Sequence, residues 1–242
     1  MNADGDSMRT PDAMNVLQLR GVEGARAATG VAVVIDVLRA FTSAAYAFAG
    51  GAERILLVGT VEEAEALQAR YPDALRMGEV GGRIIPGFAL NNSPSHVRRA
   101  DLRGRTMIQR TGAGTPCAVA ATGADEILLA SFVVAGATAR YALGRRASAV
   151  SLIATAAFQP PPNEDDACAG YLARLLRGEW PDAAHALATA RAAPTTRLFV
   201  DPDEPDLPAG DLALAFDIDR FDFAMPVVRD GDLLVARRVD GP

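Results

Sequence analysis

The chain has 242 residues and a formal net charge of −6, and 50% of its residues are hydrophobic while 22% are charged. These values are ordinary for a soluble globular protein, and the acidic balance argues against a general nucleic-acid-binding protein. No apolar run approaches the roughly 20 residues of a membrane span. All 24 basic residues are Arg, which excludes a P-loop lysine and a Schiff base.

The first residues, 1–13, are polar and predict a flexible tail ahead of a single domain at residues 14–242. This tail lacks the apolar segment of a secretory signal, so the cytoplasm is the expected location. Cys117 and Cys168 lie far apart in the sequence and indicate neither a disulfide framework nor a zinc motif.

An apolar and mostly β-branched run at residues 31–35 leads directly into Asp36, and Arg39 follows. Such a run is typical of a strand that is buried on both faces of a parallel sheet. Asp36 then lies at the carboxyl end of the strand, where open α/β sheets bind their ligands, and the two side chains could hold a cation and an anion. Alternatively, Asp36 caps the helix predicted at residues 40–49 and pairs with Arg39.

Segments that resemble strands and helices alternate along most of the chain. Further strands are predicted at residues 54–58, 74–77, 105–109, 126–130 and 149–154. Further helices are predicted at residues 61–71, 116–121, 134–143 and 167–177, and Thr60 is the predicted N-cap of the first. Another helix start is predicted at Pro94, with Ser93 as its N-cap. This alternation predicts an α/β protein, a three-layer α/β/α fold with helices on both faces of a mostly parallel sheet.

The C-terminal part of the chain breaks the alternation. Residues 201–211 carry three prolines and many acids and predict a loop or linker. Strands are predicted at residues 211–217, 225–228 and 232–239 with no helix between them, and residues 229–232 fit a hairpin turn. We therefore expect a small antiparallel addition at the C-terminus.

Four predicted strand ends carry polar residues that could converge on one edge of the sheet: Asp36 with Arg39, Glu79, residues 111–115, and Glu164 with Asp165. Carboxylates from separate strands suit Mg²⁺, which usually binds a phosphate as well. The loop TGAGT at residues 111–115 would present backbone N–H groups to an anion. Alternatively, this loop is only a tight turn, and Glu164 and Asp165 are only favourable acids in the first turn of a helix.

Between residues 31 and 228 the chain resembles the 2-phosphosulfolactate phosphatases. The motifs in the order of that family are VIDVLRA around Asp36, Gly78-Glu79, Asn92-Ser93-Pro94, Thr111 with Gly114-Thr115, and Glu164-Asp165. The resemblance implies an α/β/α fold, a homodimer, and Mg²⁺-dependent hydrolysis of 2-phosphosulfolactate to sulfolactate on the route to coenzyme M.

The resemblance also implies roles for individual residues. It implies that the catalytic residues are Asp36, Arg39, Glu79 and Asp165. It implies that the metal ligands are Asp36, Glu79, Glu164 and Asp165. It implies that the substrate is bound by Arg39, Asn92, Ser93, Thr111, Gly112, Gly114 and Thr115. Val80, Ala113 and Val134 stand where the family tends to carry polar groups, which predicts that another phosphate ester is the better substrate.

Two hypotheses about function remain open on the sequence alone. The first is a Mg²⁺-dependent phosphomonoesterase that acts on a small acidic phosphate ester, with Arg39 and the amides of residues 112–115 around the phosphoryl group. The second is a catalytically inactive relative that binds a phosphorylated metabolite or a protein partner.

Overall fold

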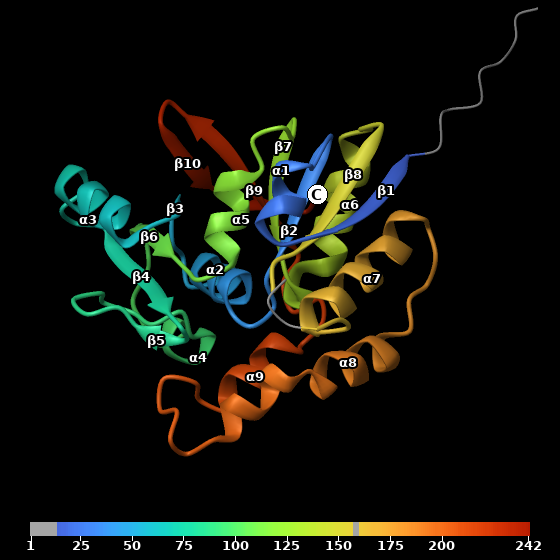
Figure 1. Ribbon diagram of the computed structural model, residues 1–242. Helices are drawn as coiled ribbons and strands as arrows, with labels where there is room; N and C mark the ends of the chain where they lie inside the picture. The colour runs from blue at the N-terminus through green and yellow to red at the C-terminus, as the bar shows by residue number, and fades with distance from the viewer. Residues whose placement is uncertain (1–13, 157–159) are drawn as a thin grey trace, which may run out of the picture.

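The computed structural model describes residues 14–156 and 160–242 (Figure 1). The predicted tail at residues 1–13 and Gln159 of the expected proline-rich turn lie outside the described residues. None of the helices in the described part of the chain is long and apolar enough to span a membrane.

The strands are β1 (Asn15–Arg20), β2 (Val31–Ile35), β3 (Arg54–Val58), β4 (Leu75–Val80), β5 (Arg83–Ile84), β6 (Thr106–Arg110), β7 (Glu126–Ala130), β8 (Ala149–Ala154), β9 (Phe223–Asp230), β10 (Leu233–Ala236) and β11 (Val239–Asp240). The helices are α1 (Gly21–Arg26), α2 (Ala40–Ala49), α3 (Val61–Arg70), α4 (Pro94–Val97), α5 (Gly114–Ala120), α6 (Ala135–Gly144), α7 (Glu164–Leu176), α8 (Ala183–Ala192) and α9 (Gly210–Ala215), with 3₁₀ turns η1 (Phe132–Val134) and η2 (Pro194–Val200).

The sheet consists of two parallel half-sheets joined by an antiparallel hairpin. Its strand order is β1-β8-β2-β7-β9-β10-β3-β6-β4-β5, with β11 beside β9. The pairs within β1-β8-β2-β7 and within β3-β6-β4 are parallel. Both pairs that β9 and β10 make with these half-sheets, and the pair between them, are antiparallel. The predicted α/β class with a mostly parallel sheet and antiparallel C-terminal strands is therefore confirmed.

These three antiparallel steps make the two half-sheets run in opposite directions, so their carboxyl ends do not share one edge. The ends of β2 and β6 nevertheless meet, because α2 and α5 lie between the two half-sheets (Figure 1). Ala40 at the start of α2 accepts a hydrogen bond from the Gln109 amide of β6 at 2.9 Å. The convergence of the site therefore depends on how the half-sheets fold around these two helices.

The core explains why β2 is an unbroken apolar run. Ala32 and Val34 face the core that encloses α2 and α5, whereas Val31, Val33 and Ile35 face a second core against α6 and α7. A third, smaller core packs α3 against the outer face of β3, β6 and β10. Each face of the sheet thus buries apolar side chains, as expected of an α/β/α protein.

One predicted strand is wrong. Residues 211–217 were expected to form a strand, but residues 210–215 form the helix α9. The segment DLALAFD alternates leucine and alanine and imitates a period of two residues. Asp211 and Ala215 are its buried helical residues, four positions apart, so the packed face follows the helical period. The strand β1 and the helices α1 and α8 were not predicted.

Candidate active site

Asp36 occupies the junction between β2 and α2. Its Oδ1 accepts a hydrogen bond from the Ala40 backbone N–H at 2.8 Å, and the residue is 6% exposed. The capping role that the sequence left open is therefore present for one oxygen. The other oxygen lies against the start of α5, where a Cβ on Gly114 would be only 2.7 Å from Asp36 Oδ2. Glycine at position 114 is thus what lets α5 approach this carboxylate.

Asp165 and Glu164 begin α7, which is capped by Asn163. The Asn163 side chain accepts from the amides of Asp165 and Asp166 at 3.0 Å, and this fixes the first turn of the helix. Asp165 accepts hydrogen bonds from the Val37 amide at 2.8 Å and from the Thr155 hydroxyl and the Ala156 amide at 3.0 Å. This carboxylate therefore ties the end of β2 to the end of β8.

Glu164 is 1% exposed and accepts a hydrogen bond from the Thr195 hydroxyl in η2 at 3.2 Å. It lies near enough to Asp36 to contribute to the electrostatics of that group, as do Asp165 and Glu79. The structure thus brings the four predicted metal ligands into one neighbourhood.

Burial gives these carboxyl groups unusual acidities. Desolvation and then repulsion by Asp165 raise the pKa of Asp36 well above its ordinary value. Desolvation, followed by repulsion from Asp165, raises the pKa of Glu164 to about 7. Desolvation also raises the pKa of Asp165 to about 6, against the hydrogen bonds that it accepts. No ion pair recorded between described residues involves Asp36, Glu79, Glu164 or Asp165, so no Arg neutralises this cluster there.

Glu79 connects two loops. Its Oε1 accepts from the Gly112 amide and its Oε2 accepts from the Gly82 amide at 2.7 Å. In the loop at residues 111–115, each of Thr111 and Thr115 donates its backbone N–H to the hydroxyl of the other, at 2.9 and 3.0 Å. The amides of Gly112, Thr111 and Thr115 are therefore occupied within the protein. Within this loop those of Ala113 and Gly114 have no recorded hydrogen-bond acceptor among the described residues.

Arg39 is buried and its guanidinium already has partners. Nη1 donates to Asp211 Oδ2 at 3.0 Å and to the Asp206 carbonyl at 2.7 Å, and Nη2 donates to the Gly82 carbonyl at 2.9 Å. The guanidinium also lies over the Phe199 ring, 5.5 Å from its centroid. Arg39 therefore joins the end of β2 to the C-terminal segment, a role that its sequence position did not indicate.

Asn92 and Ser93 lie beside the same network. The Ser93 hydroxyl donates to Asp211 Oδ1 at 2.8 Å, so it does not cap α4, although that helix begins at Pro94 as predicted. Asn92 accepts from the Gln109 amide at 3.3 Å. Sequence reasoning missed Gln109, Thr155 and Asp211, because their contacts depend on the tertiary structure: Gln109 and Asp211 bind partners far away in the chain, and Thr155 binds Asp165 across a turn.

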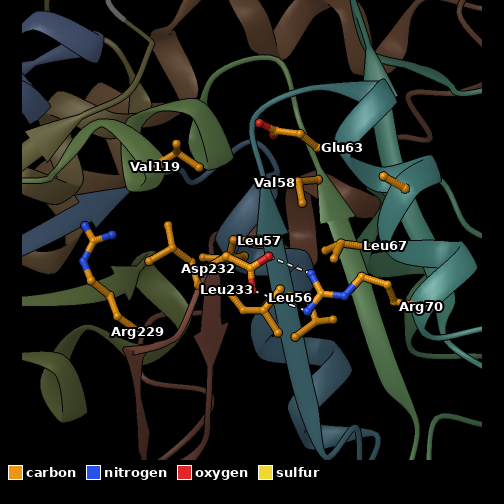
Figure 2. A pocket seen from close by; sticks show the side chains of 12 residues that line it. Leu56, Leu57, Val58, Glu63, Leu67, Arg70, Val119, Arg229, Asp232 and Leu233 are labelled. Carbon is orange, nitrogen blue, oxygen red and sulfur yellow. Dashed lines mark hydrogen bonds and ion pairs between the residues drawn. The ribbon is translucent and has the colours of Figure 1, made fainter.

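A separate pocket of about 340 Å³ lies between α3 and β10 and contains none of the predicted site residues. Figure 2 shows the Arg70 guanidinium reaching Asp232 beside Leu56 and Leu57, and the ion pair measures 2.7 Å. The pocket has an apolar floor, and its acidic residues are accompanied by Arg70 and Arg229. It therefore differs from the group of buried carboxylates that follow β2 and β8.

Comparison with known proteins identifies the family. A family model described as 2-phosphosulpholactate phosphatase matches residues 18–199. A probable 2-phosphosulfolactate phosphatase from Bacillus subtilis (strain 168) is 33% identical over 227 residues, which is 93% of this chain and 99% of the relative. The chain belongs to the 2-phosphosulfolactate phosphatase family. This is a family of phosphoric monoester hydrolases, as the resemblance of the motifs had implied.

Two further relatives match a shorter part of the chain. A probable 2-phosphosulfolactate phosphatase from Deinococcus radiodurans is 40% identical over 147 residues, 60% of this chain and 61% of the relative. One from Carboxydothermus hydrogenoformans is also 40% identical, over 144 residues, 60% of this chain and 59% of the relative.

Proposed function

We propose that this member of the 2-phosphosulfolactate phosphatase family is a Mg²⁺-dependent phosphatase that hydrolyses a small acidic phosphate monoester. The observation that carries the proposal is a group of four buried carboxylates, one after β2, one in β4 and two in the first turn of α7, which lie near one another without a recorded Arg partner among the described residues. Buried carboxylates in such a group repel one another, and a divalent cation would offset that repulsion.

The chemistry of the donors fits Mg²⁺, which takes hard oxygen ligands and often binds only one or two carboxylates together with water and phosphate. Among the described residues no three His, Cys, Asp or Glu side chains are already arranged as a metal site. Asp165 already accepts three hydrogen bonds and Glu79 accepts two backbone amides, whereas Asp36 accepts one amide and Glu164 accepts only from the Thr195 hydroxyl among the side-chain contacts recorded for the described residues. We therefore favour Asp36 and Glu164 as ligands, with Asp165 and Glu79 holding the surrounding backbone. When bound, Mg²⁺ would supply polarisation of the phosphoryl group.

The remaining groups would bind the anion. The amides of Ala113 and Gly114 and the remaining N–H groups of Arg39 are the donors available for phosphoryl oxygens. Without the ion, burial raises the pKa of Glu164 to about 7. As a ligand it would have to be deprotonated, so binding of Mg²⁺ near neutral pH would release a proton.

The substrate within this class follows from positions where polar groups are missing. The name of the family makes 2-phosphosulfolactate the first candidate. Val80, Ala113 and Val134 replace polar residues of the family's pattern, and each lost charge-assisted contact costs roughly 1.5–3 kcal/mol. We therefore propose that another phosphate ester has a higher kcat/KM. The cytoplasmic location and the homodimer expected from the sequence stay predictions.

A panel of small phosphate esters, assayed with Mg²⁺ and with EDTA, tests the proposal. We expect hydrolysis only with Mg²⁺, and we expect Asp36→Asn to lower kcat by roughly a thousandfold or more, because a hard-cation site loses charge and geometry. Glu62→Gln removes an exposed carboxylate from α3 and serves as the charge-matched control. Absence of hydrolysis of every ester would favour the inactive, ligand-binding relative instead, and an active Asp36→Asn enzyme would exclude Asp36 as a ligand.

A further inference from the structure

The segment at residues 194–211 lies against the candidate active site and contacts it at several points. It contains η2 and leads into α9, and Figure 1 shows it below the strand ends, with α8 and α9. The Asp206 carbonyl accepts hydrogen bonds from Arg39 and from the Asn91 amide, at 2.7 and 3.0 Å. Thr195 and Phe199 add the contacts to Glu164 and Arg39 described above. The acidic, proline-rich stretch is therefore a wall of the site.

Asp211 is the centre of these contacts. Its carboxylate is 0% exposed and accepts three hydrogen bonds, from Arg39 Nη1 at 3.0 Å, the Ser93 hydroxyl at 2.8 Å and the Ser95 amide at 2.9 Å. These donors come from the end of β2 and from the start of α4. One side chain thus fixes the positions of two residues that the sequence assigns to substrate binding.

The charge of Asp211 is stabilised only by the contacts that the segment makes with the rest of the site. A buried charge is costly unless it is paired and hydrogen-bonded, and here all the recorded partners lie outside the segment. Residues 201–211 contain five acids and no base, and the ion pair that Asp211 makes is with Arg39 and not with Arg197 of the same segment. Arg83 pairs with Glu204 at 3.3 Å and adds a second, more exposed attachment. The Arg39–Asp211 pair therefore links the position of the segment to the orientation of the Arg39 guanidinium.

We propose that Asp211 is a positioning residue of the active site, which holds Arg39 and Ser93 in place for the phosphoryl group and keeps residues 194–211 against the strand ends. The inference rests on the proposed function, because it takes Arg39 as a ligand of the phosphate. Asp211 itself contacts no substrate and acts through Arg39. It lies beyond the residues matched by the family model, which end at 199.

Asp211→Asn tests this role, because it keeps the size of the side chain and removes the charge that orients Arg39. We expect the Kd for inorganic phosphate, measured by calorimetry, to rise roughly 10- to 100-fold, the value of one charge-assisted contact. The KM of the best ester should rise in the same proportion, while kcat at saturation stays within about threefold. Asp203→Asn, an exposed acid in the same segment, is the matched control and should change neither constant.

A double-mutant cycle separates positioning from a general loss of structure. In an Arg39→Gln background, Asp211→Asn should weaken phosphate binding by no more than about threefold, the part that acts through Ser93, because its charged partner is already gone. Hydrogen exchange of residues 198–214 should become faster in Asp211→Asn. If Asp211→Asn does not fold, Ser93→Ala removes one donor without leaving a buried charge unpaired, and it should weaken phosphate binding in the same direction by about threefold.

The results distinguish this inference from the proposed function. Unchanged or tighter phosphate binding in Asp211→Asn, or effects that add in the double variant, would overturn the inference while hydrolysis by the wild type upholds the function. A wild type that hydrolyses no ester but whose phosphate binding responds to Asp211→Asn would overturn the function alone. A wild type that neither hydrolyses esters nor binds phosphate would overturn both.

Discussion

Individual residues of the site are governed by burial more than by their immediate sequence neighbours. Asp36, Glu164 and Asp165 all have raised pKa values, and in each case the largest cause is desolvation. Arg39, the nearest cation in the sequence motif, is paired with Asp211 instead of with these acids. The acids therefore retain their mutual repulsion, which is the electrostatic condition that favours either protonation or a bound cation.

The raised pKa values predict how stability depends on pH. Folding raises the pKa of Glu164 from 4.5 to about 7, so near pH 6 the native protein holds a proton that the unfolded chain has lost. The stabilisation that the protonated Glu164 carboxyl group contributes is fully present below the pKa of the unfolded chain, 4.5, and is lost as the pH rises through about 7. Urea unfolding in EDTA should therefore show Glu164→Gln gaining stability relative to wild type between pH 5 and pH 8.

Mg²⁺ provides the internal check on that experiment. If the cation occupies the cluster, it should stabilise the wild type more at pH 8 than at pH 5, because the ligands must be deprotonated. A difference between wild type and Glu164→Gln that stays constant with pH would show that Glu164 does not titrate in this range.

At the scale of elements, the ends of helices position the site. Across residues 14–156 and 160–242 there are two capping boxes, one at Thr60 and Glu63 before α3 and one at Asn163 and Asp166 before α7. Asn163 is buried, and its side-chain amide also donates a hydrogen bond to the Ala156 carbonyl at 3.0 Å. It therefore fixes the turn that presents Glu164 and Asp165, whereas the box at Thr60 lies at the surface of the other half-sheet.

These two caps form a matched pair of substitutions. Asn163→Ala should lower the free energy of unfolding by about 1–2 kcal/mol, because an N-cap and a buried hydrogen bond are lost. Thr60→Ala should cost about 1 kcal/mol. Only Asn163→Ala should also reduce kcat on the best ester, since only that cap supports the carboxylates. If both variants had the same kcat under conditions in which both are folded, the cap at Asn163 would not support the catalytic carboxylates.

The whole molecule is held together by its last strands. The hairpin β9-β10 pairs with β7 on one side and β3 on the other, and without it the two half-sheets would share no recorded strand pairing among the described residues. Met225, Val227, Leu234 and Ala236 of this hairpin belong to the same core as α2 and α5. The C-terminal hairpin thus forms the centre of the sheet, although it follows a long acidic segment in the sequence.

Truncation provides a direct test of this arrangement. A chain that ends at Asp222 lacks β9, β10 and β11, and we expect it to lose cooperative unfolding and to aggregate, because β3 and β7 become open edges. A chain that ends at Arg238 lacks only the two-residue strand β11 and should unfold cooperatively. Circular dichroism with size-exclusion chromatography decides between them. A soluble, cooperatively folding chain 1–222 would mean that the hairpin is only an addition.

Local features of this protein were determined by its sequence. The β-branched run before Asp36, the end of α2 at Gly50 and the cap at Thr60 each depend on neighbouring residues, and the structure contains all three. The motifs around Asp36 and Glu164 also identified the family and the carboxylates, because hard oxygen donors at strand ends indicate the same chemistry wherever the strands lie.

The tertiary structure alone decided how these elements face one another. The half-sheets run in opposite directions because β9 and β10 enter between them, and no local pattern encodes the neighbour that a strand selects. Arg39 is paired with Asp211, which lies 172 residues away. The attraction between the two charges is strengthened because tertiary packing excludes water from them, and neither local sequence encodes that packing. For the same reason residues 210–215 became a helix, since burial of Asp211 and Ala215 outweighed an apolar pattern that locally favours a strand.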